Sequence, residues 1–89
     1  MDFDTLLVWR WFGGYRGTFT NTRIAGPSSP VVSAPTANLD ALLAWAQEQV
    51  ELGVVRPTPT FTVKCDGVPI NRFLWARTMQ VARLSWEEI

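Results

Sequence analysis

Histidine is absent from the sequence and cysteine occurs once, as Cys65, and both facts limit the chemistry available to the chain. Without histidine, neither a Ser-His nor a Cys-His nucleophile pair can form, and a zinc site would have to consist of carboxylates alone. A lone cysteine cannot form a disulfide within the chain and cannot complete a CxxC motif. We therefore expect no metal, no cofactor and no enzyme activity.

The sequence also lacks an excess of charge of either sign. Its eight Lys and Arg residues are balanced by eight Asp and Glu residues, so no long-range field attracts the chain to phosphate backbones or anionic lipid. Nucleic-acid binding is therefore disfavoured and would depend on base stacking or on a local basic patch. The first residues contain no basic segment typical of a signal peptide, and no apolar run reaches the about 18 residues of a membrane helix. We expect a cytoplasmic protein that contacts no membrane.

The sequence is rich in apolar and aromatic residues for its length. Its 89 residues, 47% of them hydrophobic, are typical of one small domain, and we expect residues 1–89 to form it. Five tryptophans exceed the needs of so small a core, and tryptophan is enriched at the centres of protein interfaces. The alternative stays open that these large rings fill the core.

The strongest strand signals lie near the N-terminus. Thr5–Phe12 is rich in β-branched and aromatic residues, and Tyr15–Ile24 alternates threonine with bulkier side chains. Gly13-Gly14 separates them and predicts a hairpin with a two-residue turn. That turn places Trp11 opposite Arg16, where the guanidinium can lie across the indole as a cation–π pair worth about 0.5–1 kcal/mol at an exposed site.

The two faces of this hairpin differ in character, because side chains alternate between them. One face is apolar apart from a single arginine and is the predicted core side: Leu6, Val8, Arg10, Phe12, Tyr15, Gly17 and Phe19. The other face combines tryptophan, arginine and threonine, and five of its residues form the candidate binding site: Leu7, Trp9, Trp11, Arg16 and Thr18. This second face is either an interface or the floor beneath a helix.

A proline-rich segment follows the hairpin and precedes a helix. Residues 25–37 predict a mobile loop, in which Val31-Val32 either adds an edge strand or covers the core. Asn38 is a suitable N-cap, and apolar residues at helical spacing up to Gly53 predict the helix itself. Trp45 lies at the border of the apolar stripe, so it either packs at the sheet edge or is exposed.

The C-terminal half predicts a second hairpin and a second helix. Thr60–Cys65 alternates as a strand, Asp66-Gly67 favours a type I′ turn, and Pro69 limits the return strand to a short edge strand. From Asn71 to the end, apolar spacing predicts a helix, although Phe73–Val81 also alternates as a strand would. The expected order is ββαββα, an α+β domain whose antiparallel sheet of about four strands has both helices on one face.

Few residues are candidates for acid–base chemistry. The carboxylates are dispersed over termini, turns and solvent-facing positions, and no two form a convincing pair: Asp2, Asp4, Asp40, Glu48, Glu51, Asp66, Glu87 and Glu88. Asp2 and Asp4 are expected to fray at the chain start. Cys65 falls on an inward row, where cysteine usually acts as a small apolar residue.

These patterns support three functions in decreasing order. We expect a non-catalytic protein-binding or accessory module, of the kind that phages and mobile elements encode, whose aromatic sheet face binds another protein or a second copy of the chain. The first alternative is single-stranded nucleic-acid binding, in which Trp, Tyr and Arg side chains of the first hairpin stack on bases. The second alternative is a small enzyme that uses carboxylates.

Overall fold

The computed structural model describes residues 2–23, 31–32, 35–79 and 83–88. Within these ranges the chain forms β1 (Asp2–Trp11), β2 (Gly14–Thr20), β3 (Val31–Val32), α1 (Leu39–Glu51), β4 (Arg56–Cys65), α2 (Arg72–Met79) and β5 (Arg83–Glu88). β3 pairs with β2, so the valine pair forms the edge strand that was one of its two predicted roles. Most of the predicted proline-rich loop, at residues 24–30 and 33–34, lies outside the described residues, and so does its predicted mobility.

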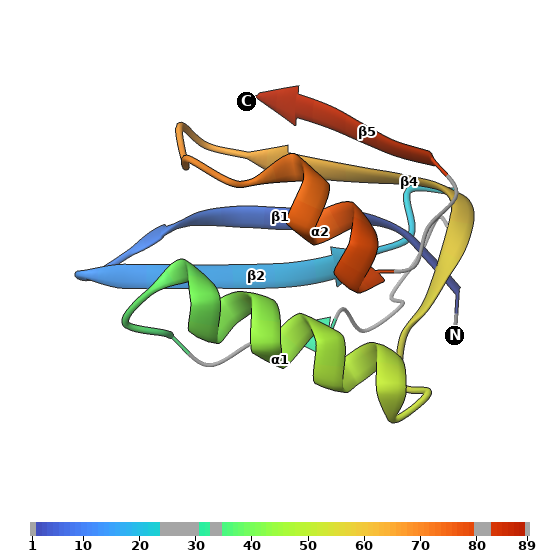
Figure 1. Cartoon of the computed structure of the whole chain (residues 1–89), viewed down its shortest axis with the longest axis horizontal. Coiled ribbons are helices and arrows are strands. Elements are labelled where there is room, and N and C mark those ends of the chain that lie inside the picture. Colours follow the sequence, from blue (N-terminus) through green and yellow to red (C-terminus); the bar gives the residue numbers. More distant parts are fainter. Residues whose placement is uncertain (1, 24–30, 33–34, 80–82, 89) are drawn as a thin grey trace.

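The strands form one mixed sheet with the order β3-β2-β1-β4-β5 (Figure 1). β1 pairs with β2 and β2 with β3 in antiparallel fashion, whereas β1 pairs with β4 and β4 with β5 in parallel. The prediction of an α+β domain with two helices is confirmed, but the prediction of an antiparallel sheet is wrong. The reason is that α1 and α2 lie in crossover connections, which return the chain to the same end of the sheet before the next strand begins.

The second predicted hairpin does not form. Gly67 has the positive φ of 61° that a turn favours, yet the next element along the chain is α2 and not a strand. Val68 is buried with 4% exposure, and Asn71 caps the next helix through its side-chain oxygen, which accepts from the backbone N–H of Leu74 at 3.1 Å. The chain therefore leaves β4 for α2, because an apolar anchor and a helix N-cap follow the turn.

The predicted C-terminal helix is right only for its first part. α2 begins after Asn71, as expected, and buries Trp75 with 2% exposure. It ends at Met79, and the chain then forms β5 from Arg83 to Glu88. The rival prediction of a strand over Phe73–Val81 is wrong as well, because that segment contains α2.

The N-terminal helix follows its sequence signals closely. The side-chain oxygen of Asn38 accepts from the backbone N–H of Ala41 at 2.8 Å, which is the geometry of an N-cap. Gly53 follows the helix with a φ of 74°, the left-handed conformation common after a helix end. Trp45 packs against Phe19 with ring centroids 5.5 Å apart, so it lies at the border of the core.

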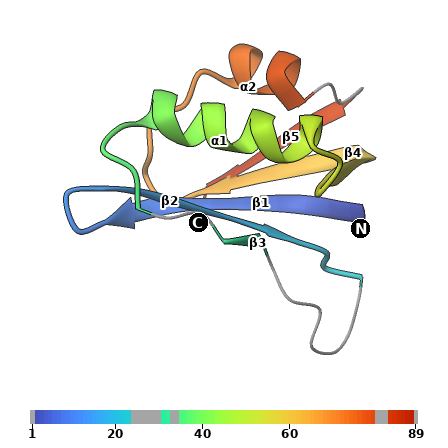
Figure 2. The same ribbon diagram turned by 90° about the horizontal axis from the view of Figure 1, so that it is seen from below.

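Both helices cover the same face of the sheet (Figure 2). From β3 at one edge the chain crosses to β4 and then to β5, in one direction across the sheet, and these three strands are parallel to one another. Crossovers of the usual hand then place both helices on one side. Between helices and sheet lies the core of apolar residues: Phe3, Leu6, Val8, Phe19, Leu42, Leu43, Ala46, Val55, Phe61, Val63, Cys65, Val68 and Trp75. We call the opposite side of the sheet the open face. Neither described helix is long and apolar enough to cross a membrane.

Candidate functional site

The five residues predicted as a binding site all lie on the open face. Leu6 and Val8 of β1 are buried under the helices, so strand alternation directs Leu7 and Trp9 to the other side. Arg16 is the ladder partner of Trp9, and Thr18 is the partner of Leu7. The structure therefore brings these residues together across two adjacent strands, as expected from the hairpin.

The register of the hairpin differs from the prediction by two residues. Trp11 pairs with Gly14, and Trp9 pairs with Arg16, whereas a turn at Gly13-Gly14 would place Trp11 opposite Arg16. The turn consists of Phe12 and Gly13, with φ values of 38° and 79°, and two positive values are typical of a type I′ turn. Because strand faces repeat every two residues, this shift leaves every predicted face assignment within the strands unchanged.

Gly14 is needed for a close approach of two backbones and not for the turn. A Cβ atom there would lie 1.8 Å from the carbonyl oxygen of Thr36. Next to it, the N–H of Tyr15 donates to the Thr36 oxygen at 2.8 Å, and the N–H of Thr36 donates to the Tyr15 oxygen at 2.9 Å. These bonds fix the start of β2 to the segment that leads into α1.

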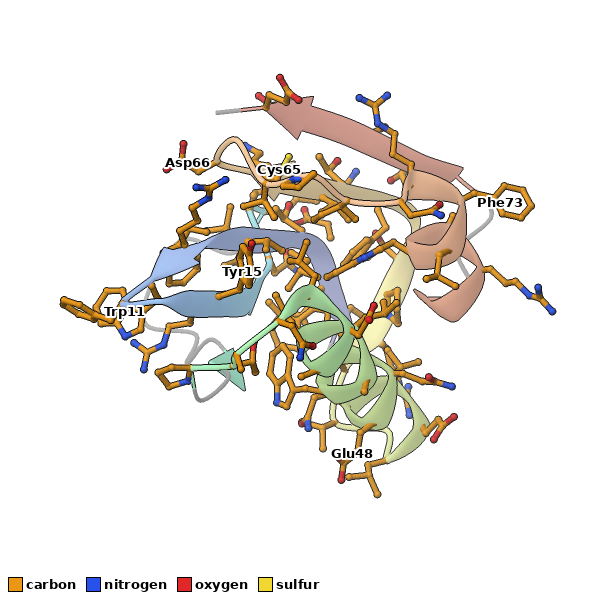
Figure 3. The ribbon with its side chains drawn as sticks, turned by 60° about the vertical axis from the view of Figure 1, so that its left-hand side comes forward. Trp11, Tyr15, Glu48, Cys65, Asp66 and Phe73 are labelled. Atoms are coloured by element: carbon orange, nitrogen blue, oxygen red, sulfur yellow. The ribbon has the colours of Figure 1, made fainter. Side chains whose placement is uncertain are left out.

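Phe12 is the most exposed large apolar residue of the described chain, with a relative exposure of 92%. The prediction that it belongs to the core side is wrong, because Phe12 occupies the turn. Its ring meets that of Trp11 edge-on, with centroids 4.7 Å apart and an interplanar angle of 79°. Figure 3 shows Trp11 at the outer end of the hairpin. Sequence reasoning missed Phe12 because the Gly13-Gly14 pair suggested a turn one residue later.

The predicted cation–π contact between Arg16 and Trp11 is confirmed. The guanidinium carbon of Arg16 lies 4.6 Å from the Trp11 ring centroid, and the two residues are diagonal neighbours in the ladder. The Nε atom of Arg16 is buried without a hydrogen-bond partner among the described residues. The indole is therefore the contact that positions this side chain.

The candidate residues differ in how much surface they offer. Thr18 is buried with 7% exposure, and β3 pairs with it through Val32. Leu7, Trp9, Trp11 and Arg16 are all half-buried. The accessible surface of this site therefore comes mainly from the tryptophans, from Arg16 and from the exposed ring at the turn. We call Trp9, Trp11, Phe12 and Arg16 the hairpin cluster.

Two hollows flank the end of the hairpin. The larger, of about 440 Å³, is lined by Arg10, Trp11, Phe12, Gly13, Gly14, Tyr15 and Ala37. The smaller, of about 290 Å³, is lined by Trp11, Phe12, Gly13, Gly14, Pro35, Thr36 and Ala37. Trp11 and Phe12 line both hollows, and so do Gly13, Gly14 and Ala37, so the two hollows adjoin beside these rings. A concave surface next to aromatic rings can accept side chains from a partner.

The other end of the open face is polar. A hollow of about 290 Å³ there is lined by Asp4, Thr5, Thr22, Arg23, Thr60, Thr62, Lys64 and Glu87. Asp4 is part of β1 and is held by Thr22, whose hydroxyl and N–H donate to the carboxylate at 2.6 Å and 3.0 Å, so the prediction that it frays is wrong. Partial burial raises the pKa of Asp4, but hydrogen bonds from Thr22 and Thr5 outweigh burial and lower the pKa below its ordinary value. Asp4 therefore has a structural partner and is charged at neutral pH.

Cys65 is a buried thiol at the end of β4, with 0% exposure. Burial raises its pKa, and the nearby charge of Glu88 raises the pKa further, so the thiolate that reacts with electrophiles is disfavoured at neutral pH. Among the residues that the structure describes, no three His, Cys, Asp or Glu side chains are grouped so that they could hold a metal ion. The hairpin cluster therefore has the most distinctive chemistry of the described surface, which consists of aromatic rings and one cation.

No protein-family model, no curated protein and no solved structure matches this chain.

Proposed function

We propose that this chain is a non-catalytic protein-binding module and that the hairpin cluster is its contact surface. The observation that carries the proposal is the exposed Trp11–Phe12 pair, held beside Arg16 on a sheet face that no described helix covers. Aromatic and arginine side chains dominate the binding energy of protein interfaces, and an exposed aromatic group on a small domain is typical of an interaction site.

The conformation of Phe12 supports this proposal. A residue other than glycine at a φ of 38° costs about 1–2 kcal/mol, and Phe12 gains no compensating burial at 92% exposure. Asparagine or aspartate before Gly13 would satisfy the same turn without that cost. The sequence therefore has an aromatic ring where folding alone favours a small polar residue, which is expected if the ring serves binding.

The hairpin cluster is also held in place before any partner arrives. The type I′ turn fixes the backbone between β1 and β2, the Tyr15–Thr36 hydrogen bonds fix the start of β2, and the cation–π contact orients Arg16 on Trp11. A surface whose side chains are already ordered loses less conformational entropy on binding. This arrangement favours specific binding of one partner protein over non-specific hydrophobic association.

Single-stranded nucleic-acid binding remains the second candidate, because aromatic rings on a sheet with an adjacent cation are typical of such proteins. The structure provides observations both for and against nucleic-acid binding. Trp9 and Trp11 lie on one face with Arg16 beside them, but Arg16 already stacks on Trp11, and Arg10 belongs to the helix side of the sheet. With a formal net charge of zero, the chain also offers little attraction for phosphates.

Site-specific photo-crosslinking tests the proposal with a matched control. Phe12 and Phe73 are both exposed, at 92% and 80%, but Phe73 lies on α2, far from the hairpin cluster. We replace each in turn by p-benzoylphenylalanine and irradiate cells of the native host that express the variant. Position 12 should give a crosslink to one defined protein, and position 73 should not. Equal crosslinking patterns from both positions would contradict the proposal.

A further inference from the structure

β5 forms one edge of the sheet, and its outer side has no strand partner in the described part of the chain (Figure 1). It is six residues long, Arg83–Glu88, and contains no proline or β-bulge, although its charged residues Arg83, Glu87 and Glu88 oppose pairing with an arbitrary strand. The opposite edge differs, because β3 has only two residues. β5 is therefore the edge on which a further strand can be added.

A second copy of the chain can supply the added strand with two-fold symmetry. Two identical strands that pair antiparallel are related by a two-fold axis perpendicular to the sheet, and residues opposite each other then lie on the same face. At the axis, a residue of one copy must therefore stand opposite the same residue of the other copy. When Ser85 stands at the axis, Arg83 of each copy is opposite Glu87 of the other, so the pair of opposite charges occurs twice.

The neighbouring registers lack this complementarity. With Leu84 at the axis, Arg83 stands opposite Ser85, and with Trp86 at the axis, Leu84 stands opposite Glu88 and Ser85 opposite Glu87. With Glu87 at the axis, the two Glu87 carboxylates face each other, and like charges directly opposite destabilise a ladder. Charge pattern therefore selects the register centred on Ser85 and selects the second copy as a suitable occupant of the edge.

We propose that two copies of this chain associate through antiparallel pairing of their β5 strands, with Ser85 at the two-fold axis. Lys64 Nζ lies 3.5 Å from Glu87 Oε2 within one copy, and the proposed register places Arg83 of the second copy opposite Glu87 in the ladder. The two sheets would become one, with both open faces on the same side. This inference does not rest on the function proposed above, because β5 lies at the other side of the sheet from the hairpin cluster.

Cysteine crosslinking tests the register directly. Ser85 of β5 and Thr60 of β4 are both exposed and uncharged, and the native Cys65 is buried. In the proposed dimer, two Ser85→Cys side chains face each other across the axis at about 4.5–5.5 Å between Cβ atoms, whereas two Thr60→Cys side chains are at least about 14 Å apart, because three strand spacings separate the two β4 strands. A short bismaleimide should crosslink most of the Ser85→Cys protein and little of the Thr60→Cys or unmodified protein. Equal yields from Ser85→Cys and Thr60→Cys would contradict the register.

Charge exchange tests the contact without introducing a thiol. Sedimentation equilibrium should show a dimer that weakens at least tenfold in Arg83→Glu and recovers in the double variant Arg83→Glu/Glu87→Arg. Glu88→Arg is the control, since Glu88 has no charged residue opposite it in this register, and its dimer should weaken less than about threefold. Melting curves of each variant check that the fold is intact.

Two outcomes would overturn the inference. The first is a protein that stays monomeric up to about 1 mM. The second is a dimer that is unaffected by Arg83→Glu and lost in Trp11→Ala, which would assign self-association to the hairpin cluster instead. In contrast, loss of the β5 dimer with retained crosslinking from position 12 would leave the proposed binding function standing on its own.

Discussion

Arg16 lies 4.6 Å above the ring of Trp11, although the ladder partner of Trp11 is Gly14 and the partner of Arg16 is Trp9. Because Gly14 has no side chain, the guanidinium can reach diagonally across the hairpin to the last tryptophan of β1. The contact connects two strands at the point where the hairpin leaves the helix-covered part of the domain. It therefore orders the aromatic surface that we assign to partner binding.

Replacement of Phe12 should separate folding from binding. Phe12→Asn should stabilise the domain by about 1 kcal/mol, because asparagine adopts the left-handed conformation at lower cost and Asn-Gly is a favoured type I′ pair. It should also reduce capture of the crosslinked partner, since the exposed ring is lost. Phe12→Ala is the control that removes the ring without improving the turn. If Phe12→Asn neither stabilises the domain nor weakens capture, Phe12 has no role in binding.

Stability should depend on pH through Asp4. The pKa of Asp4 is lowered in the folded protein from the ordinary value of 3.8, so its contribution is present above that value and is lost as pH falls through the lowered folded pKa. Thr22→Val removes the hydroxyl that donates to Asp4 at 2.6 Å and should return the pKa of Asp4 toward its ordinary value. Chemical denaturation at several acidic pH values should therefore show a weaker acid dependence in Thr22→Val and in Asp4→Asn. An unchanged acid dependence in both variants would exclude this role for Asp4.

The nucleic-acid alternative predicts a simple optical signal. Stacking of bases on Trp9 or Trp11 would quench tryptophan fluorescence, and phosphate contacts would make binding weaken steeply with salt. We expect no change on addition of a mixed-sequence single-stranded oligonucleotide at low salt, because Arg16 occupies the Trp11 face. Saturable quenching that is lost in Trp11→Ala and weakens with salt would favour nucleic-acid binding over the proposed function.

Local sequence signals predicted the features that depend on neighbouring residues. Asn38 marked the start of α1 because its side chain caps the helix within one turn, and Asn71 did the same for α2. The strand faces of the first hairpin were also predictable, since alternation survives a register shift of two residues. The five candidate site residues were for this reason placed on one face correctly.

Features that depend on distant contacts were not predictable from local signals. The alternation of Thr60–Cys65 is the same whether the neighbouring strand is parallel or antiparallel. The sequence of β4 therefore does not predict that it pairs with β1 in parallel. Arg83–Glu88 appeared helical because its apolar residues continue the spacing of α2, but pairing with β4 stabilises it as a strand. The turn at Phe12 was not predicted because the sequence suggested that Gly14 belongs to the turn. In the structure, Gly14 instead allows the backbone of Thr36 to approach closely.

The most direct test of the central claim compares stability and partner capture in the single variants Trp9→Ala and Trp11→Ala. Each tryptophan is half-buried on the open face, so each variant should lose about 1–2 kcal/mol of stability, while Trp75→Ala, at 2% exposure, should lose about 3–5 kcal/mol. Capture of the partner identified from position 12 should be strongly reduced in each of the two variants. A stability loss as large as that of Trp75→Ala, together with unchanged capture, would show that these tryptophans serve the fold and would contradict the account.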